Sequence, residues 1–202
     1  MKWTAVALVY LSISIGFFWV RSAWVTLLGF HAAMIVSLII ARPNLSLLTL
    51  FKNTNPKWII VSILPCALSG VCLYFLRSYF GFAPDLHAQL EAIGLTTQTW
   101  LPFIIYAVLV NPVIEEYFWR GYLGSAAKGF NIFDLVFASY HILVLIGKAN
   151  LPAIVLIVIV LTFAAWCWRQ IAHESGGLLA PVLGHMAADL TILLAIHRMV
   201  IS

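Results

Sequence analysis

Long apolar runs separated by short polar segments dominate the pattern of this chain. The runs are about 17–20 residues long, the length of a helix that crosses a roughly 30 Å hydrocarbon core. A membrane barrel would instead show shorter segments of alternating polarity, and no such alternation is present. The pattern predicts an all-α, polytopic transmembrane helical bundle. It has about seven spans, at Trp3–Val20, Ser22–Ala41, Trp58–Leu76, Trp100–Leu123, Phe130–Ile146, Leu151–Trp168 and Leu178–Ile196.

The connecting segments refine this topology. Only Arg21 separates the first two spans, which predicts that they form a tight hairpin or are partly re-entrant. Residues 42–57 contain several Pro and Asn residues and are expected to form a polar loop. Residues 78–99 carry a short helical pattern. It predicts a short interfacial helix, or a gate, with its leucines and Ile93 in the interface and with His87 and Glu91 toward water.

Composition supports a membrane protein and excludes a soluble one. Of the 202 residues, 63% are hydrophobic and only 9% are charged, whereas soluble domains carry about 25% charge. No internal repeat is evident, so residues 1–202 are expected to form a single integral membrane domain. The basic residues are scattered singly between apolar runs, which does not fit the clustered footprint of a nucleic-acid-binding protein.

The distribution of Lys and Arg predicts an orientation. With alternating spans, the N-terminal side (side A) carries more basic residues than the opposite side (side B), so side A is expected to be cytoplasmic. We expect a multi-pass protein of the bacterial inner (plasma) membrane with its N-terminus in the cytoplasm. The side A residues are Lys2, Arg42, Lys52, Lys57, Lys128 and Arg169, and those of side B are Arg21, Arg77, Lys148 and Arg198.

The fourth span carries a cluster of ionisable residues, which are costly inside a membrane and are therefore candidate functional residues. Glu116 and Arg120 are four residues apart, so they share a helix face and are expected to form an ion pair. Glu115 points about 100° away and is free for another partner. The alternative is a structural role, in which Glu115 pairs with a neighbouring helix. Asn111-Pro112, one turn earlier, is expected to kink this span.

Two later spans carry histidines. His141 lies four residues after Phe137, and His185 lies four residues before Asp189 among small residues that would let another helix approach. Either histidine alone is more often a packed core residue than a catalyst. Glu115 and His185 lie roughly 10 Å, and His141 roughly 16 Å, from the side A ends of their spans. Two imidazoles and a free carboxylate at similar depth are the components of a hydrolytic site.

Taken in order, these motifs resemble those of a known family. Glu-Glu-x-x-x-Arg at 115–120, Phe-x-x-x-His at 137–141 and His-x-x-x-Asp at 185–189 are similar to motifs of the CPBP (CAAX protease and bacteriocin-processing, Abi) intramembrane glutamic endopeptidases. This family includes the type II CAAX prenyl endopeptidases. Each motif alone is weak, but their order, each on its own span, is specific. The first three spans carry no usable resemblance, and His31 in the second is expected to be a packing or interfacial residue.

The resemblance implies an intramembrane endopeptidase that hydrolyses a peptide bond in or near the membrane. Glu115 and His141 would activate a water molecule, and His185 with Asp189 would stabilise the oxyanion. The catalytic core would occupy residues 100–200. The residues that would support the site are Glu116, Arg120 and Phe137.

Asp189 departs from the motif of the prenyl endopeptidases that this chain resembles. That motif has asparagine at the corresponding position. An ionised aspartate cannot donate a hydrogen bond to an oxyanion. It could instead set the tautomer of His185, as the aspartate of a catalytic triad does. A protonated Asp189 is the other option in so apolar a site, and the sequence leaves both open.

Other functions remain as alternatives. Glu115, His141 and His185 are ligand types that zinc uses in catalytic sites, although the resemblance implies no cofactor. A non-proteolytic scaffold or immunity protein and a transporter are further alternatives, although no transporter-like repeat is present. The expected partners are the lipid bilayer and a membrane protein or peptide substrate, cut in the C-terminal region of a membrane-associated or lipid-modified protein.

Overall fold

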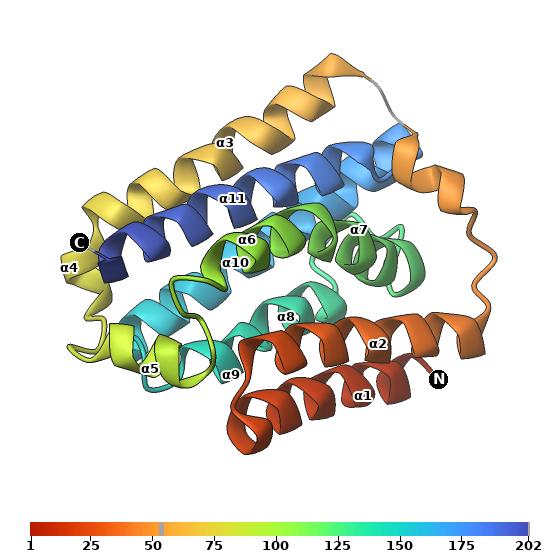
Figure 1. Ribbon diagram of the computed structural model, residues 1–202. Coiled ribbons are helices and arrows are strands. Elements are labelled where there is room, and N and C mark those ends of the chain that lie inside the picture. The colour runs from red at the N-terminus through yellow and green to blue at the C-terminus, as the bar shows by residue number, and fades with distance from the viewer. Residues whose placement is uncertain (53–54, 202) are drawn as a thin grey trace.

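The computed structural model describes residues 1–52 and 55–201, and these form a bundle of helices without a strand. Six helical segments are long and apolar enough to cross a membrane, and a shorter apolar segment covers Ile132–Leu145. The described ends of the chain lie at opposite ends of the bundle (Figure 1). The expected all-α, polytopic architecture is confirmed.

The first two spans form the expected tight hairpin. Helix α1 (Lys2–Ser14) continues as the π-helical segment η1 (Ile15–Val20), and α2 (Ala23–Ala41) follows at once. Arg21 turns the chain with a left-handed φ of 55°, and the side chain of Ser22 accepts a hydrogen bond from Val25 N to cap α2. Helices α1 and α2 therefore lie side by side at one edge of the molecule (Figure 1).

Helix α3 (Pro56–Phe75) runs along α11 (Leu179–Ile201) at the other edge (Figure 1). The close approach depends on glycine. A Cβ on Gly184 would collide with Ser62, and one on Gly70 would collide with Thr191. The small residues expected to admit a neighbouring helix therefore do so, and that neighbour is α3.

The fourth span is interrupted where Asn111-Pro112 predicts a kink. Helix α6 (Trp100–Leu109) ends before α7 (Asn111–Glu116), which continues as the π-helical segment η3 (Tyr117–Tyr122). Proline supplies no N–H to the preceding turn, and π-helical turns widen a helix and often occur at functional sites. The interruption places the Glu115-Glu116 pair at the centre of an irregular segment.

The fifth expected span, Phe130–Ile146, is shorter and broken. Helix α8 (Ile132–Ser139) and helix α9 (His141–Leu145) meet at Tyr140. At about 1.5 Å per residue, the two together are shorter than a bilayer core. Helix α10 (Leu151–Ser175) extends beyond the expected Leu151–Trp168.

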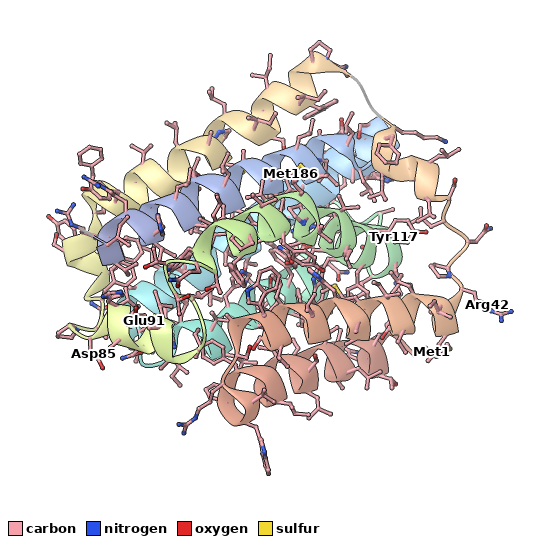
Figure 2. All side chains as sticks on the ribbon, viewed as in Figure 1. Met1, Arg42, Asp85, Glu91, Tyr117 and Met186 are labelled. Carbon is pink, nitrogen blue, oxygen red and sulfur yellow. The ribbon has the colours of Figure 1, made fainter. Side chains whose placement is uncertain are left out.

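The connectors also contain helices. Helices α4 (Arg77–Phe80) and α5 (Leu86–Ala92) lie between α3 and α6, and Asp85 and Glu91 mark the edge at α5 (Figure 2). His87 and Glu91 are exposed and lie 3.5 Å apart, whereas Leu90 of the same helix is buried in an apolar cluster with Trp100 and Ile104.

Residues 42–57, expected to be a polar loop, instead include the 3-10 helix η2 (Leu47–Phe51). Its Leu50 is buried in an apolar cluster with Tyr117, Leu178 and Val182. The Tyr117 hydroxyl also donates to Leu45 O at 2.7 Å. The polar composition of this connector did not predict the buried Leu50, whose apolar contacts hold the connector against η3 and α11.

A buried ion pair joins α10 to α8. The Arg169 guanidinium donates to both carboxylate oxygens of Asp134 and to the carbonyls of Ser125 and Gly129. Both charged side chains are almost fully buried. The sequence interpretation of Arg169 as a charge in the side A connector is therefore wrong, because this residue lies within α10.

We expect Arg169→Met to lower the free energy of unfolding by about 3–5 kcal/mol, because it leaves the Asp134 carboxylate buried without its partner. Thermal unfolding of the purified protein in detergent measures this loss. Arg198→Met, at an exposed arginine, is the matched control. Equal unfolding temperatures for the two variants would contradict the structural role of the pair.

Candidate functional site

Glu115 lies on α7 with its carboxylate held by two neutral donors. The residue is 1% exposed. The Trp119 indole Nε1 donates to Oε2 at 3.1 Å, and the Tyr140 hydroxyl lies 3.0 Å from both carboxylate oxygens. Within the described ranges no ion pair involves Glu115. Hydrogen bonds satisfy this carboxylate while no cation neutralises it.

Glu116 is held by two groups that can carry positive charge. Its Oε2 lies 3.1 Å from Arg120 Nε, which confirms the ion pair expected from helical spacing. Its Oε1 lies 2.8 Å from His185 Nδ1, across the gap from α7 to α11. A carboxylate only accepts hydrogen bonds, so the Nδ1 of His185 carries the proton. Glu116 is therefore both the partner of Arg120 and the residue that orients His185.

Aromatic rings surround these charges. The Phe137 ring lies 4.0 Å from the guanidinium carbon of Arg120 and is edge-on to both His141 and His185. The Trp168 ring stacks on His185 with the ring centres 5.1 Å apart. Such faces attract a guanidinium, and they exclude water from the pair. The structure places Phe137 at the centre of the expected site residues.

His141 begins α9, directly after Tyr140. Its Nδ1 lies 3.2 Å from the carbonyl oxygen of Ala138, and because a carbonyl only accepts, Nδ1 is the donor. In the neutral ring, Nε2 then carries the lone pair. The Tyr140 ring stacks on His141 with centres 4.1 Å apart, so Tyr140 touches both His141 and Glu115.

Asp189 lies one turn after His185 on α11. Its Oδ1 is 3.5 Å from His185 Nε2, and its Oδ2 accepts a hydrogen bond from Asn111 Nδ2 at 3.1 Å. The Asp189 side chain is 22% exposed, and His141 is also partly exposed. The accessible edge of the cluster is therefore the one formed by His141 and Asp189.

The structure brings the expected site residues together but distributes their contacts differently. The sequence interpretation left Glu115 to face His141 and His185. Instead, His185 bonds to Glu116, and in the described part of the chain Tyr140 connects Glu115 to His141. Helical spacing shows which residues share a face, whereas the contact made across two helices depends on their rotation.

Sequence reasoning missed several residues of this cluster. Trp119 stands four residues after Glu115 and follows from the same spacing rule that identified Arg120. His31 is buried, which is one of the two expected outcomes, but its contact with Asn111 was not predicted. Tyr140 and Trp168 carry no spacing signal that distinguishes them from packing residues.

The zinc alternative concerns Glu115, His141 and His185. In the part of the chain that the structure describes, no group of at least three His, Cys, Asp or Glu side chains is arranged to hold a metal ion.

The helical bundle and its buried polar cluster define a multi-pass integral membrane protein with the groups of a hydrolase. Residues 97–191 match the family model described as type II CAAX prenyl endopeptidase Rce1-like. The match confirms the family resemblance drawn from the motifs and supports an intramembrane protease of the CAAX type. It runs from just before α6 into α11, so that α1, α2 and α3 lie outside it. Neither a curated protein nor a solved structure gives a significant match.

We expect Tyr140→Phe to destabilise the protein by about 1.5–3 kcal/mol, the usual contribution of a hydrogen bond to a charged group. In a Glu115→Leu background the same change should cost much less, because the hydroxyl then has no carboxylate partner. Unfolding in detergent of the two single variants and the double variant measures this coupling. Tyr79→Phe, at an exposed tyrosine, is the control, and an equal cost of Tyr140→Phe in both backgrounds would contradict the contact.

Proposed function

We propose that this chain is an intramembrane glutamic endopeptidase in which Glu115 and His141 activate a water molecule. The observation that carries the proposal is the buried Glu115 carboxylate, held by neutral donors. One of these donors, Tyr140, also stacks on the His141 imidazole, whose Nε2 lone pair is available. A base of this kind removes a proton from water without first breaking an ion pair. The remaining groups then have separate roles in peptide hydrolysis.

In the proposed reaction, Glu115 takes a proton from water while His141 Nε2 accepts a hydrogen bond from it. The water oxygen forms a bond to the peptide carbonyl carbon, and the carbonyl oxygen becomes an oxyanion. Before the reaction, Asp189 orients the Nε2 N–H of His185 from 3.5 Å away, and His185 then donates this N–H to the oxyanion. Glu115 then returns the proton to the leaving nitrogen as the C–N bond breaks, which restores the carboxylate.

Glu116, Arg120 and Phe137 act as supports in this proposal. Glu116 holds His185 through Nδ1 and is itself held by Arg120, so neither Glu116 oxygen is left for chemistry. Phe137 packs its ring against Arg120 and against the two histidines. The proposed catalytic core remains residues 100–200 of a single domain covering residues 1–202.

The proposed substrate is the C-terminal region of a membrane-associated or lipid-modified protein. It would approach the partly exposed edge at His141 and Asp189. The excess of Lys and Arg on side A supports a cytoplasmic N-terminus, although the burial of Arg169 removes one charge from that count. We place the protein in the bacterial plasma membrane in this orientation.

Glu115→Gln and His141→Ala are each expected to reduce cleavage by about 10²–10⁴-fold, the usual contribution of a general base. Terminal proteomics of membranes from cells that express wild-type or variant chains measures this loss as the disappearance of new protein termini. Glu91→Gln and His87→Ala change exposed residues of α5 and should leave the termini unchanged. New termini that persist in both site variants would contradict the proposed roles of Glu115 and His141. A wild-type chain that produces no new termini would favour a scaffold or a transporter.

The proposal also predicts that the purified protein acts without zinc. Elemental analysis should find no stoichiometric zinc in active protein, and a chelator should leave the appearance of new termini unchanged. One zinc per chain, lost together with activity on chelation, would instead support the alternative site at Glu115, His141 and His185.

A further inference from the structure

A series of hydrogen-bonded polar side chains leads into the site from α2, which lies outside the family match. His31 is 2% exposed. Its Nδ1 lies 3.0 Å from the Tyr106 hydroxyl and its Nε2 lies 2.9 Å from Asn111 Oδ1. Asn111 in turn donates through Nδ2 to Asp189 Oδ2. Contacts therefore connect Tyr106, His31, Asn111 and Asp189 in sequence, and the reaction described above gives no role to the first three.

The direction of these hydrogen bonds follows from the chemistry of Asp189. An ionised carboxylate only accepts, so the Asn111 amide must present N–H to it and its carbonyl oxygen to His31. His31 must then donate through Nε2, which leaves Nδ1 to accept from the Tyr106 hydroxyl. Every group in the chain is satisfied in this one direction.

The same hydrogen bonds could also run in the opposite direction, which would require a different protonation of Asp189 and His31. A protonated Asp189 would donate to the Asn111 carbonyl, the amide would turn over, and the proton of His31 would lie on Nδ1 instead. The arrangement around His185 favours the first direction. This imidazole lies between the carboxylates of Glu116 and Asp189, and a proton on each of its nitrogens pairs with an ionised Asp189.

We propose that His31 is a positioning residue that, through the Asn111 amide, holds Asp189 as an ionised acceptor facing His185. Its role in catalysis rests on the proposed function, whereas the hydrogen-bond arrangement does not. Without the His31 donor, the Asn111 amide can rotate and turn its carbonyl toward the carboxylate. Repulsion between the two oxygens then displaces Asp189, and His185 loses the group that orients Nε2.

The tautomer of His31 tests the arrangement directly. The full-length chain is labelled with ¹⁵N-histidine in detergent micelles, and the ring nitrogen signals are assigned by single histidine substitutions. We expect the proton of His31 on Nε2 and a lone pair on Nδ1. A proton on Nδ1 would overturn the proposal. The spectrum is that of the wild-type chain, and the variants serve only to assign its signals.

Coupling to His185 tests the positioning role. His31→Leu should shift the His185 ring signals, and Asn111→Leu should shift them in the same direction. His31→Gln should largely restore them, because the Gln amide can still donate to Asn111 Oδ1. His87→Leu, at an exposed histidine, is the control. His185 signals that are the same in His31→Leu and the wild type would overturn the coupling.

Activity separates this proposal from the proposed function. His31→Leu should slow the appearance of new termini in the proteomic assay by about 10–100-fold, the effect of losing one hydrogen bond at a charged group, and His31→Gln should recover most of the rate. Full activity in a folded His31→Leu variant would overturn the positioning role. A wild-type chain that produces no new termini would overturn the proposed function, while the ¹⁵N spectra would still decide the arrangement at His31.

Discussion

Burial of carboxylates in an apolar bundle is the constraint on which this structure depends. A buried charge without a partner costs several kcal/mol, and the surrounding lipid offers no donors in place of water. Glu116 meets this requirement through Arg120 on its own segment and His185 on α11. Glu115 meets it with Tyr140 from the break between α8 and α9. These contacts specify the rotation of three segments about one another, which apolar packing alone specifies less strictly.

The irregular backbone of the core serves the same requirement. The break at Asn111-Pro112 places the Asn111 side chain against both α2 and α11. The break at Tyr140 turns its hydroxyl toward Glu115 while leaving His141 at the start of the next helix. A continuous helix would present residues 140 and 141 about 100° apart. The polar contacts of the site are thus concentrated where regular helices end.

Much of the fold and part of the site follow from residue spacing. The length of the apolar runs predicted the spanning helices, and separation by four residues predicted the contact of Glu116 with Arg120, because both are properties of a single helix. The second partner of Glu116 could not be predicted in this way. It depends on the depth and rotation of α7 relative to α11, and no local pattern encodes either. The role of His31 was not predicted for the same reason, since its partner Asn111 lies on another helix.

In the proposed function, the two adjacent glutamates act as a support and a base side by side on one helix. Glu116 contacts Arg120 and His185, and withdrawing either contact would leave a charge buried without its partner. Glu115 contacts only neutral donors among the described residues, so a proton can reach its carboxylate without breaking an ion pair. Glu115 and Glu116 have different surroundings because neighbouring residues on a helix face directions about 100° apart. The proposed division of roles therefore rests on what each carboxylate touches, and the Glu-Glu pair makes both environments available within one turn.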